Sequence, residues 1–506
     1  MPEISRFDVL MGDVNDILCA VNLLDWDART GMPAAGAVGR GRQVATLTGL
    51  ARDLATGDAM RAALDEARRA LAGAPPGDPR RRAVDDAGTA VAALRRLPAA
   101  LVTEAADLKT RAAAAWVEAR RADDFAGFRP WLERTVAIRR EWAEALGYAD
   151  HPYDALLAQY EPGMTLARLR PLYATLSAGL RPLLDRALAA PQPDTRFLER
   201  RYPVEDQRAF AMLVAKRFGF DAARGRLDDT VHPFEISMGR DDVRITGRFR
   251  EDWLPGGLFA VWHEAGHGLY EQGVDPALSR SLATTDLLNL YAVAGASFGL
   301  HESQSRLLEN RVARSHRFWQ LHFGELRARF PEQLAEADAD LFWRAVNRVR
   351  PSLIRVEADE LTYDAHIMMR TEIEAALIGG ELAVGDLPGA WADGMRDGLG
   401  LCVPNDREGV LQDVHWATGL VGSFPTYTLG NVMGAQIFAA AVAAPEVANG
   451  LERGDYGPLR HWLNRHVHRH GRSRTPTEIL RDATGSDLDP SIYLGQLAAK
   501  VDRLAA

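Results

Sequence analysis

Two histidines and a glutamate stand at the spacing of a metal-binding helix. Residues 261–268 read Val-Trp-His-Glu-Ala-Gly-His-Gly, so His263 and His267 are four residues apart. On a helix, side chains at this spacing project from the same face, and two such imidazoles can bind one tetrahedral zinc ion. Glu264 follows the first histidine directly and could act as general base toward a water molecule at that ion. The alternative is a helix whose two histidines make only structural hydrogen bonds.

A catalytic zinc site also needs a third protein ligand and an open coordination position. Glu302 follows His267 by 35 residues, which leaves room for a helix end, a loop and a second helix packed beside the first. We therefore expect Glu302 to complete a His-His-Glu site. Taken alone, Glu302 could instead pair with Arg306 four residues later, as many surface carboxylates do. His301 fits either a structural hydrogen-bonding partner or a substrate contact.

The elements that must position these residues are predicted to be mostly helices. Ala, Leu, Arg and Glu dominate the long segments, and in the run over 97–144 apolar residues recur three or four apart. Segments 72–79 and 191–194 contain the prolines that mark loops, and both are too short for flexible domain linkers. An apolar stripe would turn the motif-bearing helix toward the core: Leu258, Phe259, Trp262 and Tyr270.

One stretch departs from the helical pattern. Residues 242–249 read Asp-Val-Arg-Ile-Thr-Gly-Arg-Phe, and this alternation is typical of a half-buried strand. Arg244, Thr246 and Arg248 would then share one face, with Val243 and Ile245 on the other. A surface hairpin is the plain interpretation. Because the stretch lies just before the metal motif, a strand beside the site is the alternative.

Composition excludes several classes of protein. The chain has 506 residues, 47% of them hydrophobic and 25% charged, which is typical of a folded globular protein rather than a disordered, fibrous or membrane-spanning one. The net charge of −9 gives no long-range attraction for nucleic acid or anionic lipid. Cys19 and Cys402 are the only cysteines, and residues 1–8 lack the basic and apolar regions of a signal peptide. We expect a cytoplasmic protein with no nucleic-acid or membrane partner.

Nearly the whole chain resembles the carboxypeptidase Taq family of metallocarboxypeptidases. Family-like segments begin at Leu24-Asp25-Trp26-Asp27, and five signatures follow in the family's order. They are D-x-R-x-T at Asp242, Arg244 and Thr246; H-E-x-x-H at 263–267; H-E-S-Q at 301–304; I-R-x-x-A-D at Ile354, Arg355, Ala358 and Asp359; and G-x-x-Q-D-x-H-W at 409–416. One motif would be weak, but five in order are specific.

The resemblance implies a mainly α fold of the gluzincin type, with a deep active-site groove and a small β-sheet beside it, in a single domain over 1–506. It implies a zinc ion, a homodimer, and release of single amino acids from the free C-terminus of peptides with broad specificity. Cobalt could occupy the same ligands, because affinity order and metal availability both decide which ion is bound.

Carried over residue by residue, the family's metal ligands correspond to His263, His267 and Glu302, and its catalytic glutamate corresponds to Glu264. Tyr427 looks like the tyrosine that such helical peptidases place near the transition-state oxyanion. Glu264 would take a proton from water and pass it to the leaving amine, while Tyr427 and the metal would polarise the carbonyl.

Three departures from the family pattern stand out. Ser423 occupies a position that is usually tyrosine, and Trp262 stands where a smaller aliphatic residue is usual. The segment 283–299, which joins the two metal-bearing helices, is poorly matched and could reshape the pocket. None of these departures removes a ligand.

An exopeptidase must also recognise the free carboxylate of its substrate. Arg355 and Arg244 are the candidates, because the planar guanidinium can bind a carboxylate through two hydrogen bonds. Arg355 could instead form an intrahelical pair with Asp359, four residues later.

Other motif residues have less defined roles. Arg244 and Thr246, on an edge strand, could line the groove, where an extended peptide would pair with the strand's backbone. His415 could donate to the substrate carbonyl or be a core histidine beside Trp416. Gln412 is a further candidate for substrate binding.

Two other functions remain open on the sequence. A metal-dependent oligopeptidase or dipeptidyl carboxypeptidase of similar architecture would also use this motif, but would not need to trap a free C-terminus at the first residue beyond the scissile bond. A catalytically decayed peptide-binding protein is the alternative from another class.

Overall fold

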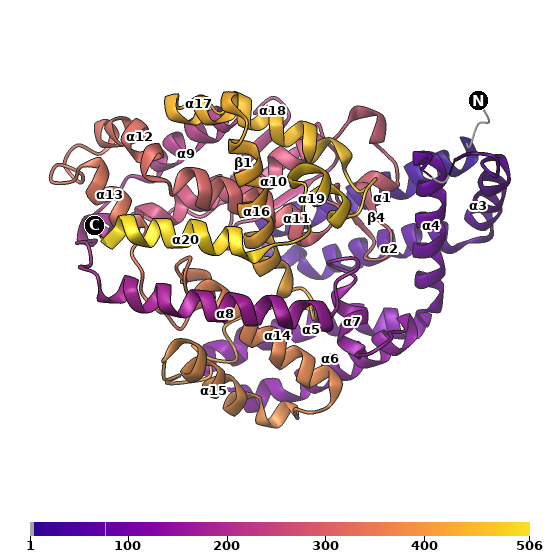
Figure 1. Cartoon of the computed structure of the whole chain (residues 1–506). Helices are drawn as coiled ribbons and strands as arrows, with labels where there is room; N and C mark the ends of the chain where they lie inside the picture. Colours follow the sequence, from indigo (N-terminus) through magenta and orange to yellow (C-terminus); the bar gives the residue numbers. More distant parts are fainter. Residues whose placement is uncertain (1–4, 76, 506) are drawn as a thin grey trace. The chain divides into compact units, whose positions relative to one another are not determined.

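Helices make up most of the computed structural model, which describes residues 5–75 and 77–505 (Figure 1). Within those residues the strands form one three-stranded and one two-stranded sheet, so the predicted mainly α fold is confirmed. Residues 1–4 of the segment inspected for a signal peptide, and residue 76 of the loop predicted over 72–79, lie outside the described residues.

The chain divides into two compact units. The first comprises residues 1–95, 193–346 and 430–489, and the second comprises residues 96–192, 347–429 and 490–506. The expectation of a single domain stays a prediction.

The first unit contains the metal motif. Its N-terminal helices are α1 (Ser5–Thr30), α2 (Ala37–Thr56), α3 (Asp58–Ala70) and α4 (Pro79–Arg96). Its central elements are α9 (Val204–Phe218), β1 (Gly225–Asp229), β2 (Glu235–Ser237), β3 (Val243–Gly247), α10 (Leu254–Gly273), β4 (Thr285–Asp286), β5 (Tyr291–Ala292), α11 (Phe298–Arg306), the π-helix η5 (Leu307–Ala313), α12 (His316–Arg329) and α13 (Ala339–Val346). Most of α16 (Pro425–Val442) follows, with α17 (Pro445–Arg453), α18 (Gly457–His466) and α19 (Pro476–Thr484).

The predicted strand over 242–249 is confirmed as β3, but it is not an edge strand. The strand order is β1-β3-β2, with β1 parallel and β2 antiparallel to β3. Because β3 has hydrogen-bonded neighbours on both sides, an extended peptide cannot add to it, and the expectation that Arg244 and Thr246 lie on an edge strand is wrong. Val243 and Ile245 are buried as predicted, and Thr246 is buried too.

The helix that carries the metal motif, α10, is anchored by its apolar stripe. All four residues predicted for the stripe are buried, and Pro255 occupies the first turn, where its missing N–H costs no helical hydrogen bond. Trp262 packs against Phe210, Phe218 and three further aromatic rings, and its Nε1 donates to the Ala211 carbonyl at 3.1 Å. The unusual tryptophan before His263 is therefore a core residue.

The second unit is entirely helical within the described residues. Its helices are α5 (Ala99–Ala122), α6 (Phe125–Leu146), α7 (Pro152–Leu157), α8 (Leu166–Ala189), α14 (Tyr363–Gly379), α15 (Leu387–Leu399), the first turn of α16 and α20 (Pro490–Ala505), and α8 and α20 run side by side (Figure 1).

The long helical run predicted over 97–144 is divided into two helices. Asp123 adopts a left-handed conformation with φ of 59° and ends α5, and the Asp124 side chain accepts a hydrogen bond from Gly127 N and begins α6. Asp is tolerated at both a left-handed helix end and an N-cap, and apolar periodicity alone does not reveal either.

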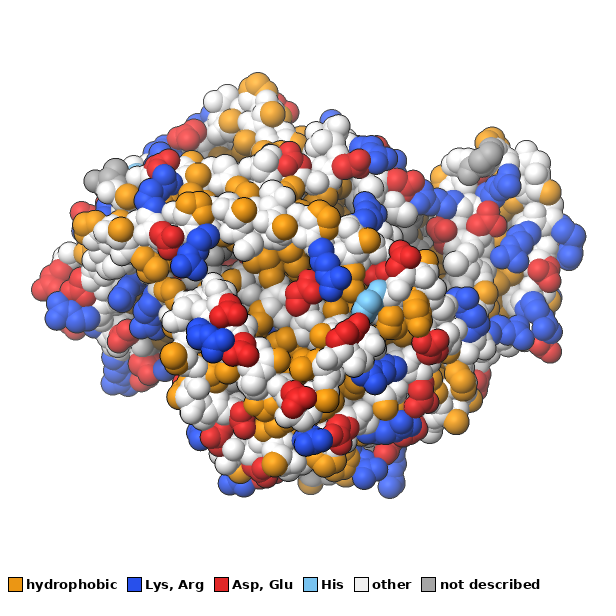
Figure 2. All heavy atoms as spheres, turned by 60° about the horizontal axis from the view of Figure 1, so that its bottom comes forward, with side chains coloured by type: hydrophobic (Ala, Val, Ile, Leu, Met, Phe, Trp, Pro, Cys, Tyr) orange, Lys and Arg blue, Asp and Glu red, His pale blue; other side chains and the backbone are white. Residues whose placement is uncertain are grey.

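Among the described residues, no single helix has the length and apolar character to cross a membrane; only α16 and α17 taken together, with a bend of 100° between them, meet that test. Figure 2 shows basic and acidic side chains interspersed over most of the face in view, which agrees with the small net charge.

Candidate metal and substrate site

A glycine contact brings the two motif-bearing helices together. A Cβ added at Gly266 of α10 would lie 2.5 Å from the Gln304 carbonyl oxygen and from the Ser305 Cα of α11. Only glycine permits such an approach of two backbones. Glu302, which lies within one turn of this contact on α11, thereby reaches the histidines of α10.

The structure brings together the three side chains predicted as metal ligands. Glu302 Oε2 lies 3.4 Å from His263 Nε2 and 3.2 Å from His267 Nε2. These three atoms lie within 4.8 Å of one another, and the trio is the one His, Cys, Asp and Glu cluster found with this geometry among the described residues. Two imidazole nitrogens and one carboxylate oxygen are the donor set that zinc accepts in a catalytic site. The residues present therefore fit such an ion.

Each imidazole is oriented through its other ring nitrogen. His263 Nδ1 lies 3.0 Å from Glu309 Oε2, and His267 Nδ1 lies 2.6 Å from His301 Nδ1. His301 continues to Glu271, with 3.0 Å between Nε2 and Oε1. Hydrogen-bonded carboxylates behind ligand histidines fix their tautomer and ring orientation. His301, predicted as a substrate contact or a structural partner, is buried and contacts the predicted ligand His267.

The segment 283–299 supports the same chain of contacts. It forms the β4–β5 hairpin, and the backbone N–H of Ala294 donates to Glu271 Oε1 at 2.9 Å. Ser237 of β2 donates to the other oxygen of Glu271 at 2.9 Å. The unusual segment thus helps to position Glu271. Glu271 in turn contacts His301, and His301 contacts His267.

The ion pair of Glu302 with Arg306, which was the alternative to metal binding, is present in the structure. Arg306 Nε donates to Glu302 Oε1 at 2.7 Å, and the pair is buried rather than solvated. Oε2 remains directed at the two histidines. The ion pair and the cluster therefore coexist, because each uses a different carboxylate oxygen.

The electrostatics differ between the two histidines. Burial alone would lower the pKa of His263, but Glu302 and Glu309 outweigh it and raise that pKa to about 10. Burial lowers the pKa of His267 to about 3; the hydrogen bond with Glu302 opposes this shift, and the imidazoles of His301 and His263 add to it. Burial alone would raise the pKa of Glu302, but Arg306 and His263 hold it well below its usual range. Glu302 is thus ionised, as a carboxylate must be to bind a metal.

Glu264 is buried beside this cluster. Burial raises its pKa to about 7, with the charge of His263 opposing the rise. A carboxyl with such a pKa is able both to accept and to release a proton near neutral pH, as general acid–base catalysis requires.

The second unit assembles the predicted residues Arg355 and Gln412 around a buried aspartate. Arg355 donates to Asp413 Oδ1 from Nε and Nη2 at 3.0 and 2.9 Å, and Arg370 Nε donates to Oδ2 at 2.7 Å. Gln412 Oε1 accepts from the Arg355 backbone N–H and from Arg370 Nη2. The intrahelical pair of Arg355 with Asp359 is absent from the described contacts of these residues.

The Asp359 carboxylate instead accepts hydrogen bonds from the backbone N–H groups of Arg350 and Leu361 and from the Thr362 hydroxyl. The i,i+4 pair considered as the alternative does not form, because Arg355 lies in the short 3₁₀ turn η6 (Arg355–Glu357) and not in an α-helix.

Tyr427 and His415 also contact each other in this unit. The Tyr427 hydroxyl lies 3.1 Å from His415 Nε2, and the His415 ring packs against Phe424 at 4.5 Å between centroids. Burial lowers the pKa of His415 to about 3, and Arg355 adds to that shift. His415 is therefore neutral. Ser423 is buried, and its hydroxyl donates to the Leu420 carbonyl at 2.9 Å.

Arg244 and Thr246 are engaged within the first unit. Arg244 forms two hydrogen bonds to Asp242, at 2.9 and 2.8 Å, and lies over the Trp26 ring. The fully buried Thr246 hydroxyl accepts from Phe234 N and donates to Phe234 O, at 2.7 and 2.9 Å. Direct contact between this hydroxyl and a substrate is not supported by its position.

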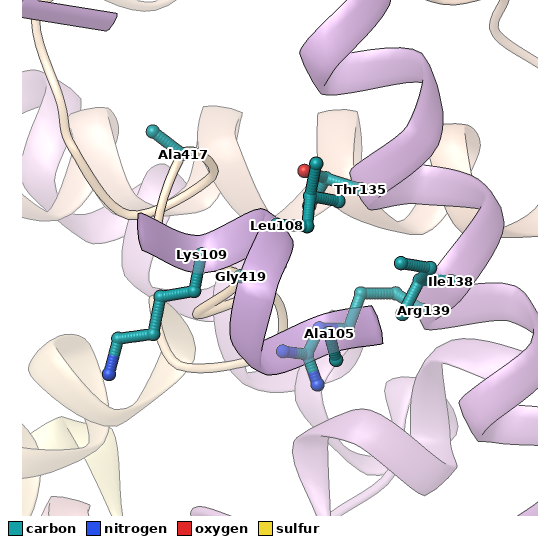
Figure 3. Close-up of a pocket in the computed structure, with 8 residues that line it drawn as sticks. All are labelled: Ala105, Leu108, Lys109, Thr135, Ile138, Arg139, Ala417 and Gly419. Atoms are coloured by element: carbon teal, nitrogen blue, oxygen red, sulfur yellow. The ribbon is translucent and has the colours of Figure 1, made fainter. Parts of the chain in front are cut away.

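A cavity in the second unit lies apart from the predicted residues of that unit. It has about 200 Å³ of empty space, open solvent included. Figure 3 shows its lining from α5, α6 and the loop before α16: Ala105, Leu108, Lys109, Thr135, Ile138, Arg139, Ala417 and Gly419. None of the candidate site residues is among them.

The sequence analysis missed several residues of the site. Glu271 lies four residues after His267 on α10, a spacing that places both on one helical face and could have identified it. Glu309 lies seven residues after Glu302, beyond the end of α11 in the π-helix η5. Arg29 and Glu235 are remote in sequence: β2, which begins with Glu235, packs on α10, and α1, which carries Arg29, packs on β2.

Comparison with known proteins agrees with this geometry. A profile of the family described as carboxypeptidase Taq (M32) metallopeptidase matches residues 6–501. The chain is 42% identical over 489 residues to thermostable carboxypeptidase 1 of Thermus thermophilus, which covers 94% of each chain. It is 38% identical over 487 residues to carboxypeptidase 1 of Bacillus subtilis, covering 96% of this chain and 95% of that one.

Solved structures give the same result. The M32 carboxypeptidase from Deinococcus radiodurans has a TM-score of 0.93 and 40% identity, covering 99% of this chain and 98% of that one. The carboxypeptidase of Pyrococcus furiosus has a TM-score of 0.92 and 31% identity, covering 98% of each chain.

The geometry of the cluster predicts that one variant loses zinc binding and that another loses only peptide hydrolysis. Glu302→Gln removes one anionic donor but keeps its shape, so the zinc retained after dialysis should fall to about a tenth or less of the wild-type content. Glu264→Gln is the matched control, because it leaves all three donors in place: it should keep its zinc and lose peptide hydrolysis. Elemental analysis and a peptidase assay check both. Full zinc retention in Glu302→Gln would contradict the ligand assignment.

The buried Asp413 predicts a large stability effect. Asp413→Asn leaves Arg370, whose side chain is 0% exposed, without its counter-charge, so unfolding free energy should fall by about 3–5 kcal/mol. The control Asp393→Asn removes a partner of the exposed Arg396 and should cost less than about 1 kcal/mol. Denaturant titration measures both, and equal effects would contradict the prediction.

The same pair of variants carries a pH dependence. Burial alone would raise the pKa of Asp413, but Arg355 and Arg370 hold it far below its ordinary value of 3.8. Its contribution to stability is therefore present above that value and is lost as the pH falls below it. Asp413→Asn should lose stability less steeply than the wild type below pH 3.8.

Proposed function

The chain belongs to the carboxypeptidase Taq family of metallopeptidases and is a peptide hydrolase, and from this premise we propose that it releases single amino acids from the free C-terminus of peptides with broad specificity. The observation that carries the proposal is the convergence of His263, His267 and Glu302 beside the buried Glu264.

His263, His267 and Glu302 would hold a zinc ion through Nε2, Nε2 and Oε2. When bound, zinc supplies Lewis-acid chemistry, polarising a carbonyl oxygen and lowering the pKa of water. Glu309 and His301 keep the two imidazoles in the orientation that presents Nε2. Cobalt would fit the same donors.

Glu264 is the proposed general base. Its carboxylate accepts a proton from the attacking water and delivers that proton to the amine of the leaving amino acid. Its burial supports this role, because a pKa raised to about 7 lets one group perform both transfers near neutral pH.

Tyr427 is proposed, on the family resemblance, to donate its hydroxyl hydrogen to the substrate carbonyl as that oxygen becomes negative. The contact with the neutral His415 supports the role by giving the hydroxyl a defined orientation.

Arg355 and Gln412 are proposed substrate-binding residues on the same resemblance. Two N–H groups of Arg355 are already bound to Asp413 and one to the Tyr363 hydroxyl, so it would bind a peptide carboxylate only through those that remain. A homodimer, a cytoplasmic location and the absence of nucleic-acid or membrane partners are likewise proposals from sequence.

Mass spectrometry of products tests the activity. We expect the zinc-loaded protein to shorten a peptide one residue at a time from its free C-terminus, to leave the C-terminally amidated form intact, and to stop when a chelator is added. Internal cleavage of both forms would identify an oligopeptidase, and release of dipeptides would identify a dipeptidyl carboxypeptidase. No cleavage of either form by fully loaded protein would favour a peptide-binding protein without catalysis.

A further inference from the structure

Arg29 lies near the end of α1, in the same unit as the metal cluster, and forms no ion pair with a carboxylate among the described residues. Arg244, Arg306 and Arg314 of the same unit are paired with Asp242, Glu302 and Glu309. The Arg29 guanidinium makes no hydrogen bond or ion pair within the described chain. Its Cζ lies 3.3 Å from the centroid of the Phe234 ring, and its side chain is exposed. Burying a charge without a partner is costly, so an exposed, unpaired arginine in this position is available to a ligand.

The surroundings of Arg29 are rigid. Asn22 Nδ2 on α1 donates to the carbonyls of Ser237 in β2 and Ala292 in β5, each at 2.8 Å. Arg29 lies seven residues later, on the same face of the helix. The Thr246 hydroxyl forms hydrogen bonds with both the N–H and the carbonyl of Phe234. The guanidinium of Arg29 packs on the ring of the same phenylalanine. The buried threonine of the D-x-R-x-T motif therefore positions Arg29 through Phe234.

The same contacts bring Arg29 close to the catalytic glutamate. β2 packs along α10, where Ser237 donates to Glu271, and Glu264 lies two turns before Glu271 on that helix. Packing on the Phe234 ring removes part of the hydration of the guanidinium and lowers the pKa of Arg29, while the charges of Tyr291, Glu264 and Asp25 oppose this shift. Arg29 is thus within electrostatic reach of Glu264.

Tyr291 supplies a second unused donor. It lies in β5, within the unusual segment 283–299, and its hydroxyl has no hydrogen bond among the described residues. Burial raises the pKa of Tyr291, with Glu235 and Asp25 adding to the rise and Arg29 opposing it. The phenol therefore keeps its proton and can donate a hydrogen bond, and its strand β5 packs against α1, which carries Arg29.

We propose that Arg29 and the Tyr291 hydroxyl form a subsite that binds a carboxylate of the peptide next to the scissile bond. The guanidinium offers two parallel N–H donors to the two oxygens, and the phenol offers a third. Arg355 and Arg244, in contrast, each hold an internal aspartate that a substrate would have to displace or share.

This inference rests on the proposed function, because it names the group that recognises the substrate of that same site. The carboxylate could be the terminal one or the side chain of an Asp or Glu residue, and both present the same chemistry to Arg29.

The kinetic test compares full-length, zinc-loaded wild type with Arg29→Gln, Arg29→Lys and the control Arg6→Gln, which changes an exposed arginine at the far end of the same helix. Loss of a charged hydrogen-bonded contact should raise KM for a peptide with a free C-terminus about tenfold or more, with kcat within about threefold of wild type. Arg29→Lys should fall between, and Arg6→Gln should match the wild type. A role limited to packing on Phe234 would change thermal stability and leave KM unchanged, and that result would overturn the inference.

Peptide affinities measured by calorimetry on the inactive Glu264→Gln background distinguish binding of the terminal carboxylate from binding of a side-chain carboxylate. The probes are a tetra-alanine peptide, its C-terminal amide, and an amidated peptide ending in Glu. If Arg29→Gln weakens only the first, the terminal carboxylate is bound; if it weakens only the third, the side-chain carboxylate is bound. Tyr291→Phe should weaken the same peptide by a smaller factor, which keeps the test valid if Arg29→Gln folds poorly. Unchanged affinities for both peptides in Arg29→Gln and Tyr291→Phe would overturn the inference.

The outcome is distinguishable from failure of the proposed function. Wild-type protein that binds the free peptide through Arg29 but releases no amino acid would refute the carboxypeptidase activity and keep the subsite. Wild-type turnover with an unaffected Arg29→Gln would refute the subsite and keep the activity.

Discussion

The contact of α11 with glycines of two other helices is the constraint on which the candidate metal site depends. At Gly266, α10 lies so close that a Cβ would overlap the backbone of Ser305. On α16, a Cβ at Gly430 would lie 2.6 Å from the Glu302 Cγ, and one at Gly434 would lie 2.7 Å from the Ser303 carbonyl oxygen. Glu302 is therefore confined between two backbones, and its carboxylate is directed at both histidines without a flexible loop.

Around this contact, neighbouring side chains orient the two imidazoles and keep Glu302 ionised. Glu309 orients His263, and Glu271 orients His267 through His301, while Arg306 keeps Glu302 ionised. Segment 283–299 and β2 each donate a hydrogen bond to the Glu271 carboxylate. Segments far apart in the chain thus converge on the imidazoles, which is how a buried polar cluster remains ordered in a low-dielectric interior.

Much of this arrangement follows from sequence. The spacing of His263 and His267 predicts a shared helical face, and alternation predicts β3. The position of β3 at the centre of its sheet did not follow, because alternation is the same in central and edge strands. Likewise, the partner of Arg355 is Asp413, 58 residues away, rather than the Asp359 that helical spacing suggested. Arg29 shows the same limit, since only long-range packing places its guanidinium on the Phe234 ring.

A zinc titration of the variant Gly266→Ala, followed by calorimetry, tests this account most directly. Its control is Gly324→Ala on α12, where an added Cβ meets no atom within 4 Å. The account predicts that Gly266→Ala, with helical content retained by circular dichroism, binds zinc at least about a hundredfold more weakly although every ligand is present, while Gly324→Ala binds as the wild type does. Wild-type zinc affinity in Gly266→Ala would contradict the dependence of the site on this helix contact.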